Sequence, residues 1–426
     1  MEYRKRIADE LLELQLEAAG VVLIDGAKWC GKTTTALQQA KSVIYMDDPE
    51  NKSNYLRLAE TNIQVLLQGS TPRLIDEWQK APQIWDACRF VVDRRGEDGQ
   101  FILTGSAEPV NQSQLGHTGT GRVGWVHMRP MSLFESGESN GLLSLSSLFE
   151  GKFDAVAANE LKINDLCHLI CRGGWPKSIG KSERAALRQA YNYIDAVAKR
   201  DVIEVDATDR SETNTRKLLR SYARHQGTQA TNGTIAADLS ANEDKLLSDG
   251  TITSYLNALR KIFVIEDMEA WNPNLRSKAA IRTTDTRYFV DPSIATAALG
   301  IGPKDLAKDL NTLGLLFETL AVRDLRVYAE ALDGAVYHYR DNNGLECDSV
   351  MHLRNGHYGL IEIKLGGNSL IEEGAKNLTL LAKKIDTDRM YAPSFMMVLT
   401  GTGQYAYQRQ DGVLVVPICC LRPYVL

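Results

Sequence analysis

The sequence lacks several features that would fix a compartment or a partner. No apolar run reaches the length needed to cross a membrane, and the start, MEYRKRIADELLEL, has no secretory core. The seven cysteines form no C-x-x-C pair, and the adjacent Cys419 and Cys420 cannot easily pair with each other. The net charge of -5 argues against an overall polyanion-coating protein but leaves room for a local basic face. We expect a cytoplasmic protein with reduced cysteines and no membrane partner.

The length and composition indicate a globular chain of several domains. With 426 residues the chain is too long for one ordinary core, so roughly two to four domains are expected. The apolar runs SVIYMD (42–47), PRLIDE (72–77) and GQFILTGSA (99–107) are continuous rather than alternating. Such runs are typical of parallel strands covered by helices on both faces. The first part of the chain is therefore expected to have an α/β fold.

The stretch LIDGAKWCGKTTTAL (23–37) has the spacing of a phosphate-binding loop. A strand leads into a turn, and a helix-like stretch follows, so backbone N–H groups and the helix N-terminus would face a polyphosphate. Lys32 would reach the β- and γ-phosphates of ATP, and the Thr33 hydroxyl would complete a Mg²⁺ shell. A chance match in a Gly-rich turn is the alternative, and the flanking strand and helix argue against it. The expected nucleotide-binding residues are Gly26, Ala27, Lys28, Trp29, Cys30, Gly31, Lys32, Thr33 and Thr34.

Two acidic residues end the strand-like run RLIDE. An open α/β sheet places its ligands at the C-terminal ends of its strands. Asp76 would hold Mg²⁺, directly or through water, and Glu77 would orient or deprotonate the attacking water. Helix capping is the ordinary alternative for an Asp-Glu pair. The phosphate loop about forty residues upstream favours the catalytic interpretation.

Three further polar residues follow in the same region. Thr104 and Ser106 end the strand-like FILTGS, where their hydroxyls would contact the γ-phosphate or water, although capping is a comparable role. Arg122 ends HTGTGR, and an arginine after a Gly-rich loop can act as a finger on a neighbouring subunit's phosphate. That role would require a homo-oligomer. A plain surface arginine is the alternative.

The order of these motifs resembles an AAA+-type P-loop ATPase module of a widespread bacterial and archaeal family. The resemblance rests on GAKWCGKTTTA, LIDEWQKAPQIWDACRFVVD, FILTGSA, HTGTGR and MRPMSLFESG. It continues through CRGGWPKSI (171–179) and YIDAVAKRDV (193–202) and covers nearly the whole chain. It implies an ATPase with a small helical lid over residues 1–185, with Arg172 as a candidate lid arginine. It also implies the family's C-terminal domain, long described as of unknown function.

The segment 186–305 is expected to contain a helical linker and a winged helix, which the family resemblance also implies. SDGTITSYLNALRKI has an apolar stripe at Ile252, Tyr255, Leu256 and Leu259, and two strand-like runs follow it. In a winged helix the second helix enters the major groove of DNA. Packing without DNA is the equal alternative. The side chains expected to face DNA are Thr253, Asn257 and Arg260 on the helix and Arg276, Lys278 and Arg282 in the wing.

Residues 306–426 carry a second constellation that looks like a PD-(D/E)xK nuclease site. Asp348 lies in one expected strand, while Glu362 and Lys364 lie two apart in the next and share a face. Glu318 lies on the preceding helix. The carboxylates would bind Mg²⁺ or Mn²⁺, Glu318 through a metal-bound water, and Lys364 would orient or deprotonate the attacking water. The alternative is that charged residues simply occupy strand faces, and the fold also occurs in proteins that do not cut.

The leading hypothesis is a protein that hydrolyses ATP, acts on DNA and has a metal-dependent nuclease-like domain, with ATP and Mg²⁺ as cofactors. The alternative of a different class is an ATP-dependent switch that binds DNA or a protein and does not cut. A P-loop kinase is disfavoured because the chain beyond residue 180 shows no acceptor-substrate pattern.

Overall fold

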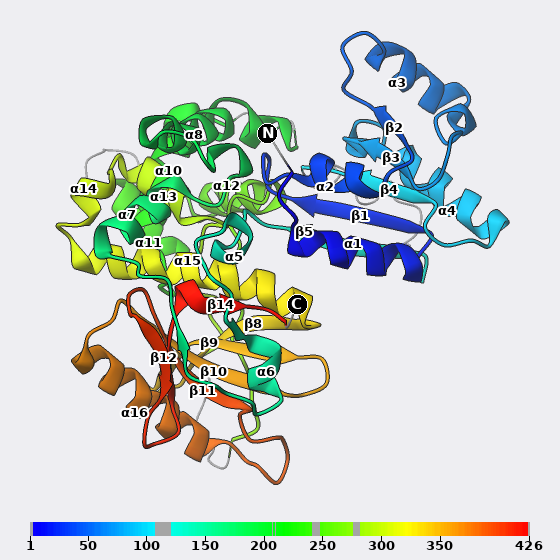
Figure 1. Cartoon of the computed structure of the whole chain (residues 1–426). Helices are drawn as coiled ribbons and strands as arrows, with labels where there is room; N and C mark the ends of the chain where they lie inside the picture. Colours follow the sequence, from blue (N-terminus) through cyan, green and yellow to red (C-terminus); the bar gives the residue numbers. More distant parts are fainter. Residues whose placement is uncertain are drawn as a thin grey trace. The chain divides into compact units, whose positions relative to one another are not determined.

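The chain forms two compact units, and each unit is made of three separate stretches of the sequence (Figure 1). The computed structural model describes residues 3–106, 121–206, 208, 210–240, 248–275 and 282–424. The first unit comprises Met1–Pro130, Arg200–Asp209 and Asn257–Val264. The second comprises Met131–Lys199, Arg210–Leu256 and Ile265–Leu426. The expected boundaries at 185 and 305 stay a prediction.

A five-stranded parallel sheet in the order β2-β3-β4-β1-β5 forms the centre of the first unit. Alternate residues of β1 enter two different cores: Val21 and Leu23 pack with α3 and α4, while Val22 and Ile24 pack with α1 and α2. This burial on both faces is what the continuous apolar runs predict. The elements are α1 (Ile7–Ala18), β1 (Val21–Gly26), α2 (Lys32–Gln39), β2 (Ser42–Tyr45), α3 (Lys52–Thr61), β3 (Arg73–Asp76), α4 (Gln83–Arg95), β4 (Phe101–Thr104), β5 (Val123–Met128) and α9 (Val202–Glu204).

The second unit contains a mixed seven-stranded sheet in the order β7-β12-β13-β11-β10-β9-β8. Helix α15 packs against β8 to β10, and α16 packs against β9 to β11 (Figure 1). Every residue of α15 from Thr319 to Ala329 is buried, so this helix is enclosed on all sides. The strands are β6 (Leu143–Ser144), β7 (Val156–Ala157), β8 (Gly334–Arg340), β9 (Glu346–Leu353), β10 (Tyr358–Lys364), β11 (Phe395–Thr400), β12 (Tyr405–Gln408), β13 (Leu414–Pro417) and β14 (Leu421–Arg422), with β6 pairing β14.

Helices make up most of the remainder of the second unit. They are α5 (Leu133–Ser136), α6 (Leu145–Phe149), α7 (Ile163–Arg172), α8 (Glu183–Ala196), α10 (Glu212–Arg224), α11 (Asn232–Ser240), α13 (Pro292–Leu299), α14 (Pro303–Leu306), α15 (Leu310–Ala331), α16 (Asn368–Lys384) and the first part of α12 (Asp249–Lys261), which belongs to the first unit from Asn257 on. Among the described residues, none of the helices combines the length and apolar character that crossing a membrane requires.

The segment expected to form a winged helix contains α10, α11 and α12, followed by two short extended pieces. The apolar stripe of α12 is buried as its periodicity predicts, including Ile252 and Leu259. The extended pieces pair through the isolated antiparallel bridges Ile265↔Phe289 and Met268↔Thr286. The next residues of the first piece also reach the large sheet, because the N–H of Trp271 donates to the carbonyl of His338 in β8 at 2.6 Å.

The Gly-Gly-Trp motif after α7 forms a buried polar joint inside the second unit. The N–H of Gly174 donates to Asp291 at 2.9 Å, and the indole N–H of Trp175 donates to Ser293 at 2.9 Å. Arg323, on α15, donates to the same Asp291 carboxylate at 2.9 Å and to Asp324 at 2.8 Å. Side-chain exposure is 2% or less for the three charged residues of this joint, so its hydrogen bonds are shielded from water.

Candidate functional site

The loop between β1 and α2 has the backbone geometry of a phosphate cradle. Gly26 has φ +130°, and a Cβ there would lie 2.0 Å from the carbonyl oxygen of Met128, so only glycine fits. Gly31 has φ +109° at the start of α2, and Trp29 has φ +68°, which is uncommon for a residue with a side chain. These positive-φ positions curl the chain at the N-terminus of α2, where backbone N–H groups suit an anion.

Lys32 is the first residue of α2, and its side chain turns back over the loop. Its ammonium donates to the carbonyls of Gly26 and Ala27, both at 2.8 Å, and the residue is only 7% exposed. A buried ammonium held by two neutral carbonyls has no counter-ion among these contacts, and a phosphate group would supply one. The structure therefore brings the predicted lysine to the predicted loop.

Asp76 accepts two hydroxyl hydrogen bonds at the C-terminal end of β3. The hydroxyl of Thr33 donates to its Oδ1 at 2.7 Å, and the hydroxyl of Thr104 donates to the same oxygen at 2.5 Å. Because β4 lies between β1 and β3, a threonine from β4 completes the group. A hydroxyl and a carboxylate are hard oxygen donors of the kind Mg²⁺ prefers, so these residues fit the ion.

Glu77 follows Asp76 in a left-handed conformation, φ +57°. This conformation turns its side chain out of the strand direction, and Gln79 donates to its Oε2 at 2.6 Å. The Ser106 hydroxyl approaches its two carboxylate oxygens at 3.4 and 3.5 Å. No sequence pattern singles out Gln79, because its contact depends on the turn that Glu77 makes. The strain at Glu77 is the kind of backbone feature that clusters at functional sites.

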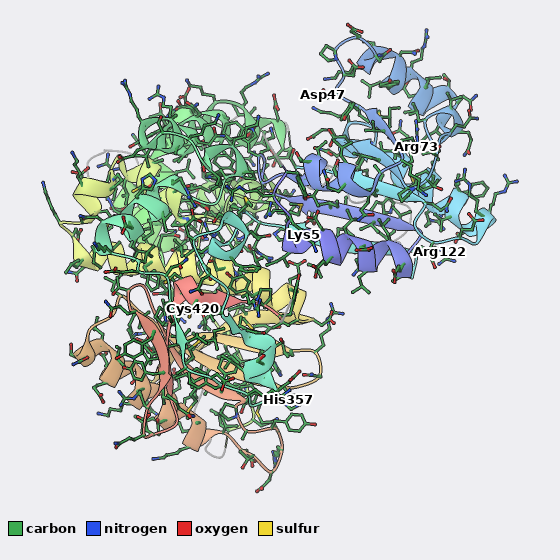
Figure 2. All side chains as sticks on the ribbon, viewed as in Figure 1. Lys5, Asp47, Arg73, Arg122, His357 and Cys420 are labelled. Atoms are coloured by element: carbon green, nitrogen blue, oxygen red, sulfur yellow. The ribbon has the colours of Figure 1, made fainter. Side chains whose placement is uncertain are left out.

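Arg122 lies at the opposite end of the sheet from the phosphate loop (Figure 2). Its carbonyl accepts from the N–H of Val21, the first residue of β1, whereas the loop follows the last residue of that strand. Its guanidinium pairs with Asp93 and is 47% exposed. The residue therefore does not serve its own chain's loop, and action as a finger on another subunit stays a prediction. Most of the Gly-rich stretch that precedes it, 107–120, falls outside the described residues.

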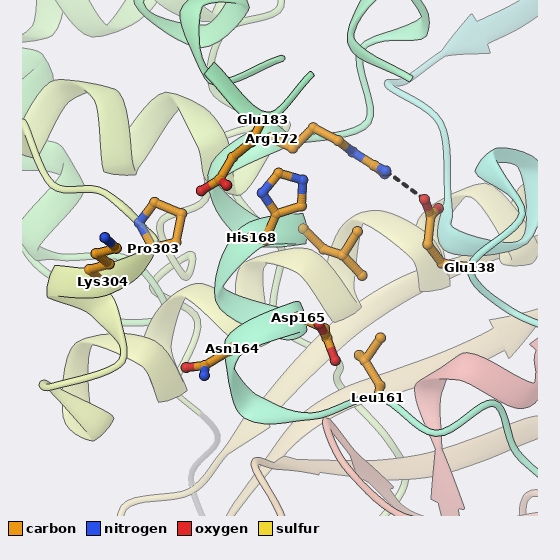
Figure 3. A pocket seen from close by; sticks show the side chains of 10 residues that line it. Glu138, Leu161, Asn164, Asp165, His168, Arg172, Glu183, Pro303 and Lys304 are labelled. Carbon is orange, nitrogen blue, oxygen red and sulfur yellow. Dashed lines mark hydrogen bonds and ion pairs between the residues drawn. The ribbon is translucent and has the colours of Figure 1, made fainter. Parts of the chain in front are cut away.

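Arg172 lines a polar cavity of about 640 Å³ in the second unit (Figure 3). Its guanidinium donates to Glu138 at 2.5 Å, and this partner helps to hold the pKa of the Glu138 carboxyl below its ordinary value against the opposing effect of burial. His168, one turn earlier on α7, faces the same cavity. The ion pair with Glu138 accounts for the burial of Arg172, and a lid role stays a prediction.

Asp348, Glu362 and Lys364 meet at one end of the large sheet. The Lys364 ammonium lies 2.7 Å from Glu362 Oε2 and 3.2 Å from Asp348 Oδ2. Asp348 also accepts the backbone N–H of Ile363 at 2.7 Å, which ties β9 to β10 at this point. The pairing that the two-residue spacing predicted for Glu362 and Lys364 is thus present, with the lysine between the two carboxylates.

The electrostatics of this group depend on burial. Glu362 is 0% exposed, and apart from the ion pair neither of its carboxylate oxygens accepts a hydrogen bond from a described residue. Burial and the neighbouring Asp348 raise the pKa of Glu362 well above its ordinary value. Burial lowers the pKa of Lys364, but Asp348 and Glu362 outweigh it and raise the pKa overall. Such an under-coordinated carboxylate fits a divalent cation.

Glu318 approaches from α15 and completes the predicted set only in part. It accepts the hydroxyl of Tyr288, and burial together with Asp348 raises the pKa of Glu318 to about 8. Within the described part of the chain, however, no three His, Cys, Asp or Glu side chains converge closely enough to form a complete metal site. Metal ligation by Glu318, Asp348 and Glu362 stays a prediction.

The three α12 side chains expected to face DNA each hydrogen-bond a neighbouring residue. Thr253 accepts from Asn232 at 3.1 Å, and Arg260 donates to Asn257 at 3.0 Å. The backbone N–H of Arg282 donates to the carbonyl of Arg340 at 2.8 Å. The other two wing residues of the prediction, 276 and 278, fall outside the described residues.

Comparison with protein families identifies the first region and leaves the others uncharacterised. Residues 18–136 match the AAA domain. Residues 163–305 and 313–421 match two domains of unknown function, DUF8612 and DUF4143. The N-terminal region is thus an AAA-type, P-loop ATPase-like domain on a parallel α/β sheet, which confirms the predicted class. The C-terminal domain of unknown function, expected from the family resemblance, is also present.

Relatives that match nearly the whole chain and solved structures with similar folds do not establish an activity for this chain. Two uncharacterised proteins, from Mycobacterium tuberculosis and Mycobacterium bovis, are each 25% identical over 423 residues, which covers 98% of this chain and 84% of theirs. A Walker-type ATPase of Pyrococcus abyssi is similar over 68% of this chain and 94% of its own, with 12% identity and a TM-score of 0.41. A RuvB variant of Thermotoga maritima is similar over 61% of this chain and 88% of its own, with 15% identity and a TM-score of 0.26.

Proposed function

We propose that the first unit binds and hydrolyses ATP with Mg²⁺. The observation that carries this proposal is the convergence of Lys32, Thr33, Asp76 and Glu77 from two separate stretches onto one end of a parallel sheet. Ligands of open α/β sheets bind at this end of the strands. The match of residues 18–136 to an AAA domain supports the same activity.

Each residue has a distinct part in this reaction. The loop N–H groups and the Lys32 ammonium bind the β- and γ-phosphates and offset the charge that develops on them. Thr33 and Asp76 hold the Mg²⁺ shell, and the ion neutralises phosphate charge when bound. Glu77 accepts a hydrogen bond from the attacking water and orients it, while Gln79 and Ser106 hold the Glu77 carboxylate.

The test compares two variants that should fail differently. Lys32→Ala should weaken nucleotide binding and abolish hydrolysis, whereas Glu77→Gln should bind nucleotide and lose turnover, by roughly 100-fold or more. Nucleotide binding is measured by calorimetry and turnover by phosphate release. Glu60→Gln, an exposed change on α3, serves as the matched control. Hydrolysis at the parental rate in Glu77→Gln would remove Glu77 from the mechanism.

We further propose that the protein acts on DNA and that the C-terminal domain is nuclease-like. The convergence of Asp348, Glu362 and Lys364 supports this, since two carboxylates and a lysine are the set that metal-dependent phosphodiester cleavage uses. In this proposal the two carboxylates hold Mg²⁺, which would polarise the phosphate when bound. Lys364 orients the attacking water, and its ammonium offsets charge on the phosphate.

A specific observation favours a second candidate, a nucleotide-dependent switch that binds DNA or a protein without cutting. Among the described residues no group of three metal-binding side chains forms, and the Lys364 ammonium lies between Asp348 and Glu362. Incubating supercoiled plasmid with Mg²⁺ or Mn²⁺, with and without ATP, separates the two. Nicking that is lost in Glu362→Gln supports the nuclease, while an intact plasmid with every ion and DNA form supports the switch.

DNA contact through α12 and the wing is proposed separately, as a winged helix. If it binds backbone phosphates, affinity should fall steeply with salt, and Arg282→Gln should flatten the slope of log affinity against log salt by about one unit. Arg354→Gln, an exposed change elsewhere in the second unit, is the control. Salt-independent binding, or none, would leave the segment a packing role.

A further inference from the structure

The phosphate loop carries a second lysine whose partner comes from far along the chain. The Lys28 ammonium donates to Asp201 Oδ1 at 2.6 Å, although the two residues are 173 positions apart. The Asp201 side chain is 8% exposed and that of Lys28 is 37% exposed. Asp201 belongs to the same compact unit as the loop. The carboxylate is therefore buried, while the lysine that pairs with it keeps contact with solvent.

The backbone on both sides of this ion pair is irregular. Lys28 precedes Trp29, the non-glycine residue of the loop with φ +68°. Asp201 ends a π-helical turn, Val197–Asp201, inserted between α8 and α9. A π-turn adds a residue to the helix, rotates the side chains that follow, and occurs often at functional sites. Here it brings Asp201 to the loop within a helical segment that began at Glu183.

A nucleotide in the loop would act on both members of the pair. Its phosphates carry negative charge, so they attract the Lys28 ammonium and repel the Asp201 carboxylate. Among the described residues Asp201 has no second cationic partner, whereas another acidic residue of the first unit, Asp47, pairs with Lys52 at 2.6 Å. Asp201 and the nucleotide phosphates thus compete for the Lys28 ammonium.

We infer that Asp201 is a positioning residue that holds Lys28 in the nucleotide-free loop and competes with the nucleotide phosphates for it. This inference rests on nucleotide binding by the loop, as proposed above. Nucleotide affinity is then set partly by the segment that carries Asp201. Reciprocally, bound nucleotide weakens the contact between that segment and the loop, because the coupling between two binding events is mutual.

The test is a double-mutant cycle on nucleotide affinity, with ADP and a non-hydrolysable ATP analogue as probes. Asp201→Asn keeps the side-chain shape but removes the charge, so it should tighten binding of the ATP analogue by about three- to fivefold, the upper value of one partly exposed ion pair. Lys28→Met should weaken binding. In the Lys28→Met background, Asp201→Asn should change affinity by less than about twofold, because the competition is gone.

Two further readouts separate this role from a purely structural one. If Asp201 only stabilised the fold, Asp201→Asn would bind nucleotide more weakly and would have a lower melting temperature. The competition predicts tighter binding instead. Hydrogen exchange across Val197–Glu204 should increase when the ATP analogue binds the parent, and should change little in Asp201→Asn, where the contact is already weakened. Glu204→Gln, an exposed acidic residue in the same segment, is the matched control.

The outcomes distinguish this inference from the proposed ATPase function. If the parent binds no nucleotide, ATP binding by the loop is refuted. If the parent binds nucleotide and Asp201→Asn leaves the affinity unchanged or lowers it, the competition is refuted while the ATPase assignment stands. The saturated rate should stay within about twofold of the parent in Asp201→Asn, since Glu77 and Ser106 are untouched.

Discussion

A buried histidine in β8 should make the second unit sensitive to acid. His338 is 4% exposed, its Nε2 has no hydrogen-bond partner among the described residues, and Gln229 contacts its Nδ1 at 3.4 Å. Burial lowers the pKa of His338 from 6.5 to about 4. The folded chain therefore keeps this imidazole neutral at a pH where the unfolded chain protonates it.

The sign and size of the effect follow from the two pKa values. Between about pH 6.5 and pH 4 the unfolded chain binds one more proton at this residue than the folded chain, so stability falls as the pH falls. A difference of about 2.5 pKa units corresponds to about 3.5 kcal/mol, at roughly 1.4 kcal/mol per unit. Above about pH 7 the effect vanishes. Protonation of His338 at low pH would weaken the contact in which Trp271 and Glu269 hydrogen-bond the backbone of His338.

The substitution His338→Phe keeps a ring in the buried space and removes the titration. Unfolding by urea is followed by tryptophan fluorescence and circular dichroism at several pH values from 7.5 to 4.5. The difference in unfolding free energy between parent and variant should shift by about 2 to 3 kcal/mol across this range in favour of the variant. Other titrating groups are shared by both chains and cancel in the difference.

A second histidine provides the control. His357 is partly exposed and stacks on Tyr391 with ring centroids 4.5 Å apart, so His357→Phe keeps a similar contact. Its pH profile shows how far a histidine-to-phenylalanine change outside the buried position alters the measurement. Parallel profiles for the parent and His338→Phe would refute the reasoning, since they would show that the buried imidazole accepts its proton as readily as an exposed one.

Three other predictions concern separate parts of the chain. If Arg122 acts as a finger between subunits, mixing Arg122→Ala chains with Lys32→Ala chains should restore part of the phosphate release. If the activity does not depend on protein concentration and the mixture restores nothing, Arg122 is a surface residue. Asp348→Ala should lose Mn²⁺ binding by calorimetry and keep the parental ATPase rate; loss of that rate with unchanged circular dichroism would show that the two sites are not separable. Asp291→Ala should lower the unfolding free energy by roughly 3 to 5 kcal/mol, because Arg323 and three other donors lose their acceptor. A loss below about 1 kcal/mol in urea unfolding would show that water replaces the Asp291 carboxylate as the acceptor.

Local patterns were enough to predict the first unit. The spacing of Gly26, Gly31 and Lys32 predicts the conformation of the phosphate loop, because seven consecutive residues form that loop. The continuous apolar runs report burial on both faces of a sheet, and the parallel strand order confirms it. Glu362 and Lys364 share a strand face for the same reason, because two-residue spacing on a strand leaves no other arrangement.

Contacts between distant segments were beyond the reach of such patterns. Lys28 looked like one more member of the phosphate loop, and its partner Asp201 became visible only through a π-helical turn that no periodicity marks. The resemblance places the Gly-Gly-Trp motif in a helical lid, which stays a prediction. Its glycine N–H and indole contact Asp291 and Ser293, more than a hundred residues further on, and no local pattern predicts these contacts.

The buried Glu362 is the strongest physical reason to expect a cation in the C-terminal domain. A carboxylate with no exposed surface and no hydrogen bond beyond one ion pair destabilises a fold, and a well-packed apolar residue at the same position would stabilise it. Gly374 on α16 makes room for this side chain, because a Cβ there would lie 3.2 Å from the Glu362 Cβ. The destabilisation is offset if a divalent cation completes the carboxylate's coordination. We therefore expect Mg²⁺ or Mn²⁺ to raise the melting temperature of the parent more than that of Glu362→Gln, with or without DNA cleavage.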